Sequence, residues 1–180
     1  GVDRRDVDIW MGTLSKGLGS CGGYIASSKN FIRFLKYTTP LLIFSTGITP
    51  ANAAAALQSI RVLRKHPERV HALQDKFKWF LQRAKALGFN TGPSFDSPVI
   101  PIIVGSWEKA MILSDMLRAK QINVMPIGYP AVEKDKCRLR FFVNIDHTHE
   151  ELEFALQSLA QAMSELNEKD QEAQLEAARA

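Results

Sequence analysis

A glycine-rich segment between two apolar runs restricts the fold of this chain more than any other feature. Residues 12–24 read G-T-L-S-K-G-L-G-S-C-G-G-Y, with one lysine, Lys16, among small and hydroxyl-bearing residues. The run before it, residues 7–11, predicts a short buried strand, and the run G-G-Y-I-A at residues 22–26 predicts a second strand. The pattern therefore places a lysine without bulky neighbours between two strands, where a ligand can approach it.

The residue types around Lys16 suit formation of an imine with an aldehyde. A lysine amine attacks an aldehyde only in its neutral form, which burial or a neighbouring cation favours. Glycines let the backbone approach a flat ring, and hydroxyls together with backbone N–H groups can hold a phosphate. The hydroxyls here belong to Thr13, Ser15 and Ser20. These requirements match pyridoxal phosphate, whose ring serves as an electron sink.

Spacing alone leaves a second interpretation of Lys16 open. A Ser-Lys pair in a glycine-rich loop is also typical of an ordinary surface lysine. The nucleotide-binding pattern G-x-x-x-x-G-K-[ST] is not matched, because Ser15 precedes Lys16 and Gly17 follows it.

The motifs along the chain resemble those of the α-oxoamine synthases. Residues 8–26 resemble the lysine segment of this family of fold-type I pyridoxal phosphate enzymes, whose members include 8-amino-7-oxononanoate synthase and serine palmitoyltransferase. Four further motifs follow in the family's order up to about Leu166: L-I-F-S-T-G-I-T-P (42–50), Y-P-A-V (129–132), R-L-R-F-F (138–142) and H-T-x-E-E (147–151). The resemblance implies an α/β fold that forms the C-terminal part of a fold-type I transferase.

The resemblance also implies an activity and a set of site residues. The family condenses an amino acid with an acyl thioester, on coenzyme A or a carrier protein, with loss of the carboxylate. Lys16 would bind the cofactor and move protons at the amino acid Cα. Thr13 and Ser15 would contact the cofactor, Thr46 would reach the phosphate of a neighbouring subunit in a homodimer, and Arg140 would receive the substrate carboxylate.

The roles assigned to Thr46 and Arg140 each have a simpler alternative. Alternation along residues 137–145 places Arg138 and Arg140 on the face opposite Cys137, Leu139 and Phe141, which is also the pattern of arginines facing solvent. A planar guanidinium can instead hold a carboxylate through two parallel hydrogen bonds, and the resemblance selects Arg140 for this role and leaves Arg138 structural. Thr46 could equally be an ordinary turn residue.

The family's D-E-A-H-S segment, which supplies an aspartate at the pyridine nitrogen and a histidine near the ring, has no counterpart here. We therefore expect this chain to correspond to the C-terminal portion of the enzyme and to be inactive alone. Two alternatives remain, a fold-type I aminotransferase and a non-catalytic fragment.

Composition and periodicity complete the expectations. We expect residues 1–90 to finish the large cofactor-binding domain, residues 91–166 to form a small α/β domain, and residues 167–180 to be a flexible or helical tail. The net charge of +4 is scattered, so no nucleic-acid partner is indicated, and no metal site is indicated either. Two cysteines and the lack of an apolar run of about 20 residues favour a cytoplasmic protein without a membrane span.

Overall fold

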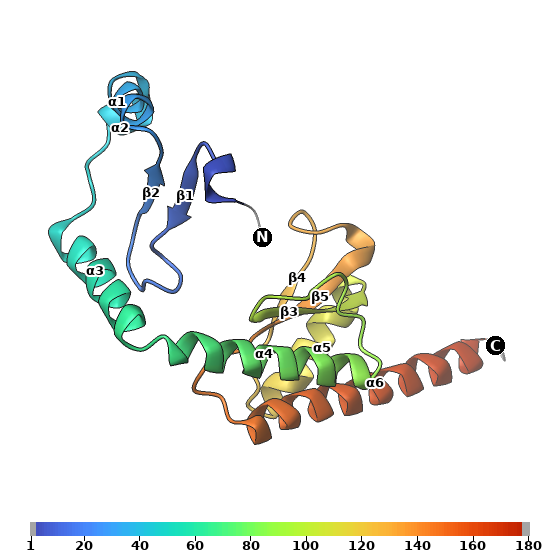
Figure 1. The fold of residues 1–180 in the computed structure, drawn as a ribbon. Coiled ribbons are helices and arrows are strands. Elements are labelled where there is room, and N and C mark those ends of the chain that lie inside the picture. The colour runs from blue at the N-terminus through green and yellow to red at the C-terminus, as the bar shows by residue number, and fades with distance from the viewer. Residues whose placement is uncertain (1–2, 178–180) are drawn as a thin grey trace. The chain divides into compact units, whose positions relative to one another are not determined.

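The computed structural model describes residues 3–177 and divides the chain into two compact units, Gly1–Pro67 and Glu68–Ala180. The first unit contains a short 3₁₀ helix, a β-hairpin and three α-helices, in the order η1 (Arg4–Asp6), β1 (Trp10–Thr13), β2 (Gly23–Ala26), α1 (Lys29–Thr38), α2 (Pro40–Ile43) and α3 (Pro50–Lys65). Figure 1 shows these elements in blue to blue-green.

The hairpin confirms the two strands predicted around Lys16 and corrects one property of the first. Strands β1 and β2 are antiparallel, with Trp10 opposite Ala26 and Thr13 opposite Gly23. Strand β1 begins at Trp10, later than predicted, and the prediction that it is buried is wrong for the described structure. A hairpin of two strands cannot bury its own side chains, and the Met11 side chain is 78% exposed.

Caps and prolines set the helix boundaries of the first unit. The Thr49 hydroxyl accepts a hydrogen bond from the N–H of Asn52 at 3.3 Å, and Pro50 occupies the first helical position of α3. Pro40 begins the short helix α2, because its fixed φ suits a first helical turn.

The second unit packs three helices against an antiparallel sheet. Its elements are α4 (Glu68–Ala86), β3 (Val99–Gly105), α5 (Trp107–Ala119), β4 (Met125–Ile127), η2 (Lys134–Lys136), β5 (Cys137–Phe142) and α6 (His149–Ala177). The strand order is β3-β5-β4, so β5 is central. Strand β3 lies at an edge, where a strand tolerates a proline such as Pro101, and it has a register shift between Ile103 and Gly105.

The core of the second unit lies between the sheet and the helices. Phe80 of α4 and Leu156 of α6 are fully buried, and the ring of Phe80 lies 5.4 Å from that of Phe141, centroid to centroid. Strand β5 alternates as predicted, with Cys137, Leu139 and Phe141 buried. This alternation fixes which face of β5 carries the arginines.

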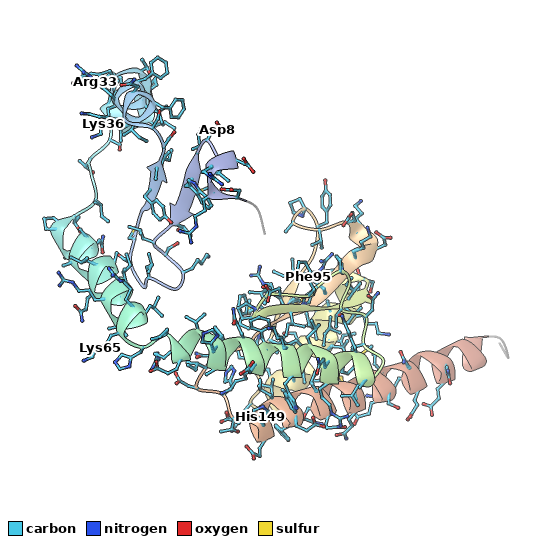
Figure 2. All side chains as sticks on the ribbon, in the orientation of Figure 1. Asp8, Arg33, Lys36, Lys65, Phe95 and His149 are labelled. Atoms are coloured by element: carbon cyan, nitrogen blue, oxygen red, sulfur yellow. The ribbon has the colours of Figure 1, made fainter. Side chains whose placement is uncertain are left out.

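Helices α4 and α6 run side by side in the second unit, and polar contacts hold them together (Figure 1). Arg83 of α4 forms a forked ion pair with Glu153 of α6, with nitrogen–oxygen distances of 2.6–3.0 Å. Hydrogen bonds from Arg83, and next from Gln157, lower the pKa of Glu153 to about 2. Figure 2 shows His149 at the start of α6, where its ring meets that of Trp79 edge to face at 4.7 Å.

Helix α4 belongs to the second unit, whereas the domain boundary predicted from the sequence follows it, near residue 90. The buried face of α4, formed by Phe77, Phe80, Leu81 and Ala84, explains the difference, because these side chains join the core shared with the sheet. Residues 167–177 continue α6 as a helix, and residues 178–180 of the predicted tail lie outside the described part. Within residues 3–177, no helix is both long enough and apolar enough to cross a membrane.

Candidate functional site

Lys16 lies at the start of a tight turn in the loop that joins β1 to β2. The N–H of Leu14 donates to the carbonyl of Gly22 at 2.9 Å, and the N–H of Ser20 donates to the carbonyl of Leu14 at 2.9 Å. Between these bonds, the N–H of Gly19 donates to the carbonyl of Lys16 at 2.9 Å. Gly19 has φ +57°, a conformation that favours glycine, and the Lys16 side chain is exposed.

The hydroxyls of Thr13 and Ser15 lie beside each other just before Lys16. Their oxygen atoms are 2.8 Å apart, and the backbone N–H of Ser15 donates to Thr13 Oγ1 at 3.2 Å. Thr13 Oγ1 also approaches the carbonyl of Gly22 at 3.4 Å. Both side chains are exposed, so their hydroxyl groups can turn toward a ligand. Three of the residues predicted from the sequence, Thr13, Ser15 and Lys16, thus lie together at the end of β1 and the start of the loop.

The space and the donors of this loop fit an aldehyde-bearing, phosphorylated cofactor. A Cβ atom added at Gly17 would meet no atom within 4 Å, so the side of the turn next to Lys16 is open. One primary amine and two hydroxyls are the groups that attachment to an aldehyde and contact with a phosphate require. Lys16, Thr13 and Ser15 are therefore the residues that could hold such a group.

An apolar groove runs beside this loop along the hairpin. Its volume is about 590 Å³, and Thr13 lies on its wall. The remaining wall is formed chiefly by apolar side chains of the hairpin and of α1, including Tyr24, Ile25, Ile32 and Leu35. Thr13 therefore stands where the polar loop meets an apolar surface.

Two contacts that sequence analysis missed attach the loop to α3. Ser20 Oγ donates to the carbonyl of Asn52 at 2.7 Å, and Ser59 Oγ donates to the carbonyl of Leu18 at 2.9 Å. The alanines of α3 allow close packing against a neighbour, but this pattern in the sequence does not indicate which neighbour.

Thr46 and Arg140 lie away from the lysine loop in the chain. Thr46 is exposed in the segment between α2 and α3. Arg140 belongs to the second unit, on β5 between Pro101 of β3 and Met125 of β4. It is exposed, and its guanidinium carbon stands 4.8 Å from the centroid of the Phe142 ring. The roles of both residues stay predictions.

Arg138 makes a local contact, since its Nε donates to the carbonyl of Lys136 at 2.9 Å. Across residues 3–177, His, Cys, Asp and Glu side chains do not gather in any group of three or more that could bind a metal ion.

Comparison with known proteins places the chain among pyridoxal phosphate enzymes. The family described as aminotransferase class I and II matches residues 1–159. The chain is 41% identical over 150 residues to an 8-amino-7-oxononanoate synthase of Fervidobacterium nodosum, covering 83% of this chain and 38% of that protein. It is 39% identical over 166 residues to an 8-amino-7-oxononanoate synthase of Symbiobacterium thermophilum, covering 92% and 42%.

Solved structures agree in fold. A serine palmitoyltransferase from S. paucimobilis, solved with pyridoxal phosphate and myriocin, matches 89% of this chain and 41% of its own with a TM-score of 0.82 at 23% identity. An 8-amino-7-oxononanoate synthase from Francisella tularensis matches 89% and 47% with a TM-score of 0.78 at 21% identity. These neighbours confirm the predicted fold class, and the chain spans about two fifths of the length of the curated relatives it matches.

Proposed function

Because the chain belongs to the aminotransferase class I and II family, we propose that the protein containing it is an α-oxoamine synthase. Such an enzyme is an acyltransferase that uses pyridoxal phosphate to condense an amino acid with an acyl thioester. The observation that carries the proposal is the position of Lys16, the one lysine of residues 12–24. The hydroxyls of Thr13 and Ser15 precede it and a glycine-containing turn follows it, in a chain that is 41% identical to an 8-amino-7-oxononanoate synthase. A homodimer and a cytoplasmic location belong to the same proposal.

Lys16 has two roles in this proposal. Its amine holds the cofactor through the aldehyde carbon, and after the amino acid has taken its place the neutral amine removes or returns a proton at Cα. Pyridoxal phosphate, when bound, supplies an electron sink for the charge left at Cα. The open space beside Gly17 supports these roles, because the amine must move between two positions.

In the same proposal, four further residues bind and orient the cofactor and the amino acid substrate. They are Thr13, Ser15, Thr46 and Arg140. The hydroxyls of Thr13 and Ser15 donate hydrogen bonds toward the cofactor from their own subunit, and Thr46 donates to the phosphate from the neighbouring subunit. Arg140 holds the amino acid carboxylate through its planar guanidinium fork. With its proton on the Lys16 amine, the substrate Cα would bond to the acyl carbonyl carbon while the carbon–sulfur bond breaks and the thiolate leaves. The carboxylate would then depart as carbon dioxide, and Lys16 would return the proton to Cα.

An aminotransferase is the second candidate, since the matching family is described by that activity. It would pass the amino group to a 2-oxo acid and would need no acyl thioester. A carboxyl-labelled amino acid separates the two. Alanine, serine and glycine would each be tested with coenzyme A thioesters of several chain lengths. We expect labelled carbon dioxide to be released only when a thioester is present. The Lys16→Ala variant should release none. Transfer of the amino group to a 2-oxo acid without thioester would contradict the proposal.

A further inference from the structure

Two of the four residues in the turn that carries Lys16, residues 16–19, have no side chain. Residues 17 and 19 are glycines, which give a backbone the greatest conformational freedom. The single bond that closes the turn runs from the N–H of Gly19 to the carbonyl of Lys16. A defined position for Lys16 therefore requires anchors from another element.

Helix α3 provides such anchors through two hydrogen bonds that run in opposite directions. Ser59 of the helix donates to the carbonyl of Leu18 in the turn at 2.9 Å, and Ser20 of the loop donates to the carbonyl of Asn52 in the helix at 2.7 Å. Asn52, Ala56 and Ser59 lie at positions i, i+4 and i+7, which share one face of a helix. Ala56 is 5% exposed, the only buried side chain among residues 3–67. The face of α3 that carries its buried alanine is thus the face that holds the loop.

The hydroxyl of Ser59 is not needed for the helix itself. Serine has a lower helix propensity than alanine, the residue that dominates α3. A serine hydroxyl within a helix commonly bonds to the carbonyl four residues earlier, whereas Ser59 bonds to a residue 41 positions away. The bond therefore stabilises the turn more than the helix.

We propose that Ser59 and Ser20 are positioning residues, which hold the turn of residues 16–19 against α3 and so set the place of the Lys16 amine. The effect on Lys16 rests on the proposed function of this lysine. The attachment of the turn to α3 does not depend on that function. Displacement of a reacting group by about 1 Å can reduce a rate by about 100-fold. Loss of either serine hydroxyl therefore weakens the reaction of Lys16 without removing any group that touches the cofactor.

Amide hydrogen exchange of the protein without cofactor tests the attachment. In Ser59→Ala we expect exchange at Gly19 and Ser20 to rise about fivefold, the change that loss of one net hydrogen bond allows. Ser59→Thr keeps the hydroxyl and should exchange like the wild type. Ser106→Ala is the matched control, because it removes a serine hydroxyl at the start of α5 in the other unit and should leave these amides unchanged.

A second measurement tests the effect on Lys16. The same proteins are treated with limiting pyridoxal phosphate and borohydride, and the pyridoxyl label on the Lys16 peptide is counted. We expect several-fold less label on Lys16 in Ser59→Ala and the wild-type amount in Ser59→Thr. The melting temperatures of both Ser59 variants should fall no further than that of Ser106→Ala.

Unchanged exchange in Ser59→Ala would overturn the proposal, and so would faster exchange with unchanged labelling of Lys16. If wild-type Lys16 takes no label at all, the proposed function fails, while the exchange comparison still decides whether Ser59 holds the turn.

Discussion

The backbone of Gly23 lies so close to Gly12 that a Cβ atom at residue 23 would stand 2.9 Å from the Gly12 carbonyl oxygen. The two glycines are on neighbouring strands, and the loop that carries Lys16 runs between them. A Cβ at Gly12 would instead meet the ring of Tyr24 at 2.5 Å, but that ring is the movable end of a half-exposed side chain. Of these two strand glycines, Gly23 is therefore the one that tolerates a side chain less.

We predict that Gly23→Ala separates the strands, since backbone atoms must move to admit the methyl group. Overpacking of this kind costs about 1–3 kcal/mol, so exchange of the Leu14 amide, which bonds to Gly22, should rise about tenfold or more. Gly12→Ala should have a smaller effect, because Tyr24 can turn away. Gly17→Ala is the control, with no atom within 4 Å of its added methyl, and equal effects in all three variants would contradict the prediction.

The ion pair between Arg83 and Glu153 predicts how the second unit responds to acid. The pKa of Glu153 is lowered to about 2, below its usual value, so the ionised carboxylate is favoured by folding. This contribution to stability is complete above the ordinary glutamate pKa and is lost as the pH falls from about 4.5 toward 2. In Glu153→Gln, the free energy of unfolding should decline less steeply over that range, as measured by urea titrations at successive pH values.

Removal of the partner provides the control for this prediction. Arg83→Gln should remove most of this acid dependence but not all of it, because the weaker hydrogen bond from Gln157 still lowers the pKa of Glu153. The double variant should behave like Glu153→Gln, because the ion pair is already lost in that single variant. Additive effects would show that the acid sensitivity arises elsewhere.

A capping box begins α6. The N–H of Thr148 donates to Glu151 Oε2 at 2.8 Å, and the N–H of Glu151 donates to Thr148 Oγ1 at 3.1 Å. Thr148→Ala should lower the free energy of unfolding of the second unit by about 1 kcal/mol, whereas Thr148→Ser should stay close to the wild type. A loss as large in the serine variant as in the alanine variant would mean that packing of the threonine methyl, not the cap, is responsible.

Sequence patterns predicted the second unit well because its elements bury one face each. The alternation predicted along β5 is confirmed, and it depends on neighbours within a few residues, as do the capping box at Thr148 and the helix from Trp107 to Ala119. The resemblance to the α-oxoamine synthases is confirmed by relatives of that family. Periodicity could not decide to which unit α4 belongs, because an apolar face shows that a helix packs but not against what.

The candidate site was predictable only in part. The lysine, its hydroxyl neighbours and the strands around them follow from one segment, so Lys16, Thr13 and Ser15 were found together. The hydrogen bonds from Ser59 to Leu18 and from Ser20 to Asn52 join residues that are 41 and 32 positions apart. A local sequence pattern does not predict contacts over such distances in the chain. The roles of Thr46 and Arg140 depend on arrangements beyond a single unit and stay predictions.

The most direct test of the central claim is to find the lysine that takes the cofactor. The protein, expressed from its complete reading frame, is incubated with pyridoxal phosphate, reduced with borohydride and digested for peptide mapping. We predict a pyridoxyl label on the peptide that contains Lys16, and its loss in Lys16→Ala. A label confined to any other lysine, or a wild-type protein that takes none, would contradict the account.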